Sequence, residues 1–175
     1  EVKGFPGGQG AVRYVSFSAE ADHLGPGVPG WQVYRKDLVS GDIVLFSSDV
    51  VGEPADFGCT YSAISEDGRY VALQSYATNL VGGDANGKLD IFRKDLVTWE
   101  MELVSASAAG VQGDDHSEFP AISGDGRYVA FHSSATNLIP TTTTTVQAFR
   151  KELAAPYRFL FAEGYTGAGF QEYLC

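Results

Sequence analysis

The segment from Asp84 to Asp90 carries the side chains best suited to binding a metal ion. Asp84, Asn86 and Asp90 place three oxygen-bearing side chains around Gly87. Calcium is bound in proteins by several carboxylate, amide and carbonyl oxygens that converge on a tight turn. The segment departs from an EF-hand loop, because its glycine is the fourth residue and no glutamate closes it. We interpret these three residues as a candidate calcium site, and a solvated hairpin turn at Asn86-Gly87 is the simpler alternative.

A second polar cluster runs from Gly113 to Glu118 and contains Asp114, Asp115, His116 and Ser117. A catalytic triad depends on its three-dimensional geometry, and neighbouring residues of one loop rarely provide that geometry. The sequence also lacks the Gly-x-Ser-x-Gly, His-Glu-x-x-His and phosphate-binding glycine motifs. We therefore expect an exposed loop here, and we predict no enzymatic activity and no cofactor other than calcium.

These candidate residues lie within a sequence repeat that must position them. From Thr60 to Ser105 the chain has four short runs of alternating apolar and polar residues, separated by turn residues. The pattern recurs on both sides, so that Arg69 corresponds to Arg13, 56 residues earlier, and to Arg127, 58 residues later. No stretch has the spacing of apolar residues expected of a helix. A period in the upper fifties with four strands per copy is typical of β-propeller blades and predicts an all-β fold.

The repeat predicts about three four-stranded antiparallel blades, at about 11–59, 60–117 and 118–160. Residues 161–175 form a tail that is either an extra strand or the start of a following domain. The strands closest to the propeller axis are expected at 61–65 and 119–123. The second strands are expected to start at Val12, Arg69 and Arg127, the third to end at Leu38, Leu96 and Leu153, and the outermost to lie near Leu45, Leu103 and Leu160.

Two copies of one motif resemble a known repeat family. Residues 65–73 and 123–131 both read Ser-x-Asp-Gly-Arg-Tyr-Val-Ala, followed by Leu or Phe. This motif is similar to that of the bacterial TolB-like, WD40-like propeller repeats called PD40. The Ala-Thr-Asn-Leu segments at 77–80 and 135–138 resemble a secreted or cell-surface subset of that family. The resemblance extends from residue 11 to about 161, and it implies a bacterial protein that is secreted, periplasmic or at the cell surface.

One position departs from the pattern of the resembled family. Arg35, Arg93 and Arg150 stand near the ends of the third strands, where that family usually has an aliphatic residue. Long arginine side chains can bury their aliphatic stems while the charged group stays hydrated. We therefore expect these stems to pack between blades and the guanidinium groups to reach solvent.

Composition limits the possible partners. The chain has 175 residues, 44% of them hydrophobic, and a net charge of −10 from 12 Lys+Arg and 22 Asp+Glu. Binding to nucleic acid or to an anionic membrane depends on basic surfaces, so we expect neither. No apolar run approaches the roughly 18 residues of a membrane span, so membrane insertion is not expected. Cys59 and Cys175 are far apart and predict no disulfide framework.

Three blades are fewer than the four to eight of a closed propeller. Three alternatives are open: a homo-oligomer that completes a ring, a part of a longer propeller, or an open stack of three blades. We predict a non-catalytic binding or scaffolding module that contacts a protein or glycan through its loops and central channel. The alternative functions are a propeller domain of a larger hydrolase with the active site outside this chain, and a calcium-stabilised structural module.

Overall fold

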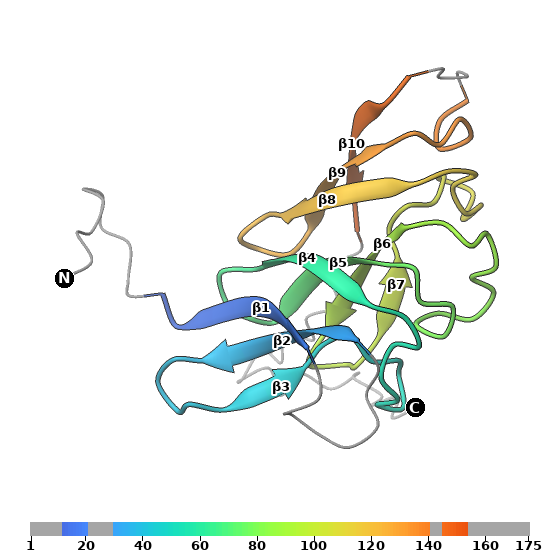
Figure 1. Cartoon of the computed structure of the whole chain (residues 1–175). Helices are drawn as coiled ribbons and strands as arrows, with labels where there is room; N and C mark the ends of the chain where they lie inside the picture. The colour runs from blue at the N-terminus through green and yellow to red at the C-terminus, as the bar shows by residue number, and fades with distance from the viewer. Residues whose placement is uncertain (1–11, 21–29, 141–144, 154–175) are drawn as a thin grey trace, which may run out of the picture.

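The computed structural model describes residues 12–20, 30–140 and 145–153, and these residues form ten β-strands and no helix. The strands make three antiparallel sheets that follow one another along the chain (Figure 1). Within the described part of the chain, no helix has the length and apolar character needed to cross a membrane. The predicted all-β fold built from propeller-type blades is confirmed.

Each sheet is an up-and-down meander with its strands in chain order. The first sheet contains β1 (Tyr14–Glu20), β2 (Trp31–Asp37) and β3 (Ile43–Leu45). The second contains β4 (Cys59–Ile64), β5 (Tyr70–Ser75), β6 (Asp90–Asp95) and β7 (Met101–Leu103). The third contains β8 (Ser117–Ile122), β9 (Tyr128–Ser133) and β10 (Gln147–Glu152). The strands predicted for the second copy are all present, whereas the outer strand predicted near Leu160 and the tail at 161–175 lie outside the described residues.

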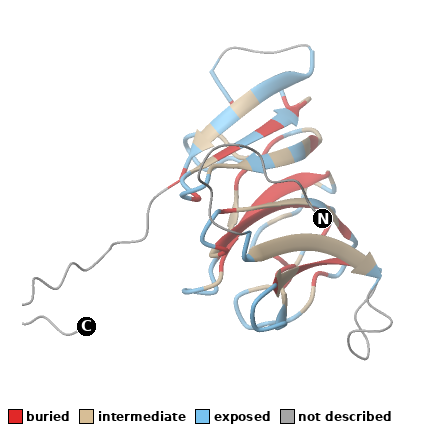
Figure 2. Cartoon of the chain, turned by 90° about the vertical axis from the view of Figure 1, so that its left-hand side faces the viewer, coloured by how far each residue is buried: buried red, intermediate tan, exposed pale blue. Residues whose placement is uncertain are grey.

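The three sheets stack face to face, and the middle one is covered on both sides. Every residue of β5 and β6 is buried, and Figure 2 shows this buried layer between the two outer sheets. Successive side chains of a strand point to opposite faces. Val71 and Leu73 therefore pack with the first sheet, whereas Ala72 packs with the third. This double coverage explains why β5 has a continuous apolar run in place of strict alternation.

The Ser-x-Asp-Gly motif forms a turn that its own side chains hold closed. The Ser65 hydroxyl donates to the Asp67 carboxylate at 2.7 Å and accepts a bond from the backbone N–H of Tyr70 at 2.9 Å. The same carboxylate accepts a bond from the N–H of Arg69. Gly68 then adopts a φ of 71°, in the left-handed region that glycine enters without strain. Gly126 repeats this geometry in the third sheet, with a φ of 72°.

This turn docks on a tyrosine of the preceding sheet. A Cβ added to Gly126 would lie 2.1 Å from the ring of Tyr70, and one added to Gly68 would lie 2.3 Å from the ring of Tyr14. Only glycine therefore fits between the turn and the ring. The backbones of successive turns are also joined, because the Glu66 N–H donates to the carbonyl oxygen of Gly124 at 2.9 Å.

The prediction that the arginine guanidinium groups reach solvent is wrong for two of the three residues. The Arg93 guanidinium lies over the Tyr70 ring, 4.8 Å from its centroid, and donates to the Gly126 carbonyl oxygen at 2.5 Å. Arg35 contacts Gly68 of the second sheet in the same way, at 2.9 Å. Docking the turn removes these carbonyl groups from water, so each requires a donor from the protein. The arginine supplies that donor, and its guanidinium lies between the sheets.

The lysines that follow Arg93 and Arg150 point to the preceding sheet. Lys94 is fully buried, and its Nζ donates to the carbonyl oxygens of Ser48 and Asp49 at 2.7 and 2.6 Å. Burial lowers the pKa of this ammonium group to about 8. Lys151 reaches back from the third sheet in the same way, and burial lowers its pKa as well. One Arg-Lys pair in the third strand thus fastens a sheet to both of its neighbours.

The seating of glycine on tyrosine can be tested with a pair of matched substitutions. Gly126→Ala is expected to lower the free energy of unfolding by about 2–4 kcal/mol, because the left-handed strain and the clash with Tyr70 add together. Gly110→Ala is the control, since Gly110 also has a positive φ of 78° but nothing within 4 Å of its added Cβ. It should cost only about 1 kcal/mol. Urea denaturation of both variants measures the difference, and equal losses would contradict the docking.

The buried lysine predicts a dependence of stability on alkaline pH. The folded-state pKa of Lys94 is about 8 against an ordinary value of 10.5, so the unfolded chain binds more protons between these values. The free energy of unfolding contributed by this group should therefore rise as the pH increases from about 8 to 10.5. Unfolding of the wild type and of Lys94→Met, measured by urea titration across this range, should give a difference that grows with pH. A constant difference would contradict the lowered pKa.

Candidate binding surface on the inner strands

The three predicted calcium ligands lie close together in the structure. Asp84 and Asp90 both accept hydrogen bonds from the side-chain amide of Gln112, at 2.6 and 3.1 Å. Asn86 donates its amide to Asp90 at 2.8 Å, and the Ser105 hydroxyl donates to the other Asp90 oxygen at 2.5 Å. Burial raises the pKa of both carboxyl groups, while these hydrogen bonds oppose that shift.

The observed arrangement of this cluster differs from a cation site. Calcium requires several converging oxygens, but here the amide nitrogens of Asn86 and Gln112 point at the carboxylates. Among the described residues, no group of three His, Cys, Asp or Glu side chains is placed to hold a metal ion. Calcium binding by Asp84, Asn86 and Asp90 thus stays a prediction. The sequence analysis missed Gln112, which lies 22 residues beyond Asp90 and shares no local motif with it.

Asp114 serves to join two loops. Its carboxylate accepts bonds from the backbone N–H and the hydroxyl of Thr136, at 2.6 and 2.5 Å, and these bonds lower its pKa. Asp56 makes the same two contacts with Thr78 one repeat earlier. The recurrence of the contact at both junctions indicates a role in holding the connection between sheets.

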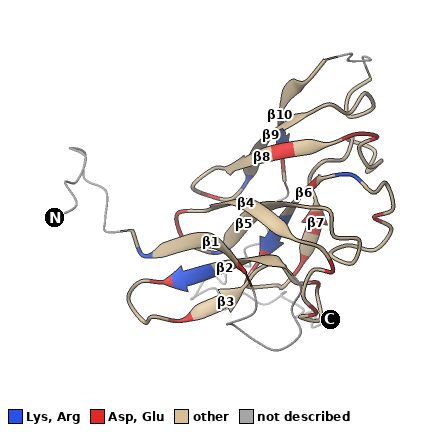
Figure 3. Ribbon diagram, in the orientation of Figure 1, with Lys and Arg blue, Asp and Glu red and all other residues tan. Residues whose placement is uncertain are grey.

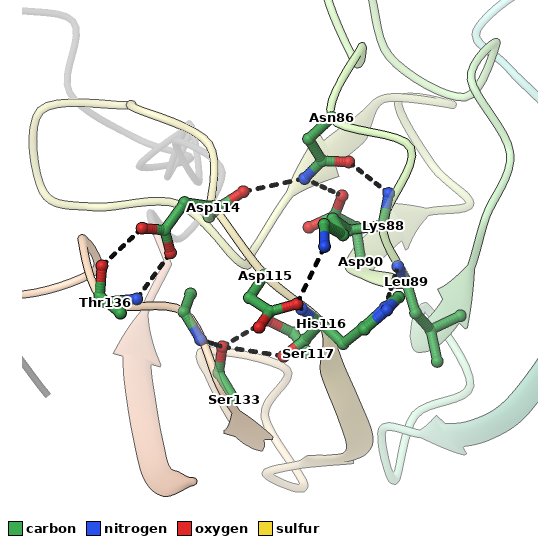
Figure 4. A network of polar contacts seen from close by, with 12 residues as sticks. Asn86, Lys88, Leu89, Asp90, Asp114, Asp115, His116, Ser117, Ser133 and Thr136 are labelled. Atoms are coloured by element: carbon green, nitrogen blue, oxygen red, sulfur yellow. Dashed lines mark hydrogen bonds and ion pairs between the residues drawn. The ribbon is translucent and has the colours of Figure 1, made fainter. Parts of the chain in front are cut away.

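The other polar residues of the second cluster also face structural partners (Figure 4). Asp115 pairs with Lys88 at 3.2 Å, and the Nδ1 atom of His116 accepts the backbone N–H of Leu89 at 2.9 Å. The Ser117 hydroxyl donates to that of Ser133 at 2.9 Å. The side chains of His116 and Ser117 therefore contact different groups, and among the described residues no hydrogen bond joins these two side chains. The absence of enzymatic activity stays a prediction.

An unpredicted feature lies on β4 and β8, the strands expected closest to the propeller axis. Tyr61 and Phe119 occupy the same position of two repeats, each in a register irregularity of the strand pair. Both have a left-handed backbone, with φ values of 42° and 57°, which is costly for side chains of this size. Their rings meet edge to face with centroids 5.2 Å apart, and they remain 60% and 50% exposed. The Phe119 N–H is fixed by the side chain of Gln74 at 2.8 Å.

Two further rings extend this surface across all three sheets. His132 of β9 lies 6.0 Å from Phe119, and Trp31 of β2 is half exposed. Trp31 and Tyr61 line a shallow groove of about 330 Å³ together with Ser18 and Thr60. We call Trp31, Tyr61, Phe119 and His132 the aromatic stripe. The second tryptophan, Trp99, is elsewhere, in the turn between β6 and β7 with its ring 5.3 Å from the Lys94 Nζ.

Charge is sparse on β4 and β8, which carry Tyr61 and Phe119, and on the neighbouring β1. Strand β4 carries no charged side chain, and β1 and β8 carry one glutamate each, Glu20 and Glu118 (Figure 3). Strand β2, which carries Trp31, also has Arg35 and Lys36, and the other lysines and arginines of the sheets lie on β6 and β10. A surface of exposed rings with a few carboxylates suits neutral or cationic ligands better than anionic ones.

Comparison with known proteins gives only a distant similarity. No family model matches the chain, and no curated protein sequence matches it. TolB from Acinetobacter baumannii is a solved structure with a similar course of the chain, at a TM-score of 0.44 and 14% sequence identity. The match covers 80% of this chain and 27% of that TolB chain, so this chain spans about a quarter of its length.

Substitution of Gln112 tests how much its hydrogen bonds to Asp84 and Asp90 stabilise the fold. Gln112→Leu should lower the free energy of unfolding in EDTA by about 1–3 kcal/mol, because Asp84 and Asp90 lose their shared donor. Gln147→Leu, at an exposed position of β10, is the control and should change it by less than about 0.5 kcal/mol.

The same denaturation experiment, repeated with calcium in place of EDTA, tests the calcium prediction. If calcium binds at Asp84, Asn86 and Asp90, it should raise the midpoint of wild-type unfolding, because a ligand that binds only the folded state stabilises it. Identical wild-type midpoints in calcium and in EDTA would contradict a calcium-stabilised module.

Proposed function

We propose that the chain is a non-catalytic binding or scaffolding module that contacts a protein or glycan through the aromatic stripe. The observation that carries this proposal is the paired exposure of Tyr61 and Phe119 in left-handed backbone conformations. Strained backbone of this kind costs about 1–3 kcal/mol per residue and is concentrated at functional sites. Neither ring has to be exposed for the core to pack, so we attribute their exposure to ligand binding.

The chemistry of the stripe defines the ligand class. Exposed aromatic rings stack on the apolar faces of sugars and pack against apolar side chains. Because aromatic side chains have few rotatable bonds, they lose little conformational entropy on binding. The four rings come from three sheets, so an extended ligand can contact all of them at once. The acidic surroundings of Glu20 and Glu118 favour a neutral or basic ligand over an anionic polysaccharide.

The proposal also includes a cellular location. The Ser-x-Asp-Gly repeats resemble those of secreted, periplasmic and cell-surface bacterial proteins, and we place this module in such a location. There it contacts a neutral glycan or a protein partner. The ligand is held on rigid strands, which favours recognition by shape with little rearrangement of the module.

The test uses the wild-type chain, a Tyr61→Ala/Phe119→Ala double variant and a Tyr76→Ala control. Binding of chitotetraose and of an immobilised library of neutral and basic peptides is measured by tryptophan fluorescence and by plate capture. The double variant should bind any ligand of the wild type at least tenfold more weakly, because central aromatic residues dominate such interfaces. Tyr76 is also largely exposed but lies against His116, outside the stripe, so its replacement should have little effect.

The proposal fails if the double variant binds as well as the wild type, or if none of the probes binds the wild type. It also fails if Tyr76→Ala weakens binding as much as the double variant does. Thermal unfolding of the three proteins checks that a loss of binding is not a loss of folding.

A further inference from the structure

The groove between the first two sheets forms one end of the aromatic stripe. Strands β1 and β4 lie side by side there (Figure 1), and the Ser62 hydroxyl donates a hydrogen bond to that of Ser16 at 3.0 Å. Its volume of about 330 Å³ is at the lower end of the range for small-ligand pockets, which suits one side chain or one sugar ring. Four residues line it: Ser18, Trp31, Thr60 and Tyr61.

A carboxylate stands beside this groove, on the face of the first sheet that points to the second. Glu20 is the cross-strand partner of Trp31, and the side chains of such partners project from the same face with Cβ atoms about 5 Å apart. Ser18 lies two residues earlier on β1 and therefore shares that face. Glu20 is exposed, and among the described residues no hydrogen bond or ion pair engages its carboxylate. The groove thus has a free negative charge at its edge.

Strands β1, β2 and β4 place no cation at this end of the groove. Neither β1 nor β4 contains a lysine or an arginine. Arg35 shares the face of Trp31 but lies four residues away, about 13 Å along the strand. Its guanidinium lies over the Tyr14 ring and donates to the Gly68 carbonyl oxygen. Lys36 points to the opposite face, because successive side chains alternate.

Two aromatic rings beside a carboxylate are well suited to recognise a cation. The face of a ring attracts a guanidinium or ammonium group, and the carboxylate adds a charge-assisted hydrogen bond. The aliphatic stem of an arginine or lysine covers the apolar ring surface at the same time. A neutral sugar would stack on the rings but leave the carboxylate without a counter-charge, and an anionic group would be repelled. Charge complementarity therefore favours a basic side chain as the occupant.

We propose that this groove binds an arginine or lysine side chain of a basic polypeptide partner. The cationic group lies against the rings of Trp31 and Tyr61 and pairs with the Glu20 carboxylate. The hydroxyl groups of Ser18 and Thr60 accept its remaining N–H groups. This inference rests on the function proposed for the aromatic stripe, and it selects a basic protein partner over a neutral glycan.

The experiment compares two capped amino acids as probes of the full-length, isotope-labelled chain. Acetyl-arginine methylamide carries the cation, and acetyl-citrulline methylamide is its neutral counterpart of nearly the same shape. NMR titration at low salt should show saturable shifts of the Trp31 indole N–H, while that of Trp99 should not move. The arginine probe should bind about fivefold more tightly than the citrulline probe, because its contacts with the rings and with the carboxylate add together. Added salt should reduce this preference.

Two variants of the protein identify the carboxylate responsible. Glu20→Gln should remove the preference for the arginine probe and leave binding of the citrulline probe unchanged. Glu100→Gln is the matched control, because Glu100 directly follows the other tryptophan, Trp99, and should leave both affinities unchanged. Both glutamates are exposed, so neither substitution should disturb the fold.

The inference is overturned if the two probes bind equally well, or if neither shifts the Trp31 signal at millimolar concentration. Retention of the arginine preference in Glu20→Gln would overturn it as well. Chitotetraose that binds at Trp31 more tightly than both probes would identify a sugar as the occupant, with the same consequence. In each of these cases the proposed function still stands if the Tyr61→Ala/Phe119→Ala variant loses the ligands of the wild type. That function alone fails if the double variant keeps those ligands while Glu20 still selects the arginine probe.

Discussion

The stack of sheets depends on the close seating of a glycine turn on the tyrosine ring of the sheet before it. The turn approaches so closely that no Cβ fits between it and the ring, at Gly68 as at Gly126. The buried carbonyl group of each glycine then needs a donor, and an arginine that lies over the same ring provides it. One small contact thus fixes the spacing and the register of two sheets and explains the aromatic, arginine and glycine positions of the repeat.

Because successive side chains of a strand point to opposite faces, the middle sheet makes polar contacts with both neighbouring sheets. In β6, Arg93 faces the following sheet and Lys94 faces the preceding one, where it satisfies two backbone carbonyl groups. A buried lysine is tolerated because these acceptors offset part of the loss of hydration, although its pKa falls. The charged pair therefore stabilises the stack through hydrogen bonds to the backbone, at sites that apolar side chains would leave unpaired.

Most of the polar residues that suggested chemistry are used to hold the connections between sheets. Asp114 closes a loop against Thr136, and His116 accepts a backbone N–H. Asp84 and Asp90 share the amide of Gln112. The aromatic stripe is different, because its rings satisfy no partner that the fold requires and because the backbone is strained at two of its members, Tyr61 and Phe119. This contrast between satisfied polar groups and exposed, strained aromatic residues separates the framework from the surface available for binding.

The sequence by itself determined the strands, their grouping into blades and the glycine turns. These features depend on residues close in the chain, on the period of two in a strand and on local turn chemistry around Asp67-Gly68. Only the tertiary structure decided that the Arg93 guanidinium lies between sheets, that Gln112 joins the predicted calcium residues, and that Tyr61 and Phe119 form one surface. Each of these depends on contacts between residues 20 to 60 positions apart. Such contacts arise when sheets stack, and no local pattern encodes them.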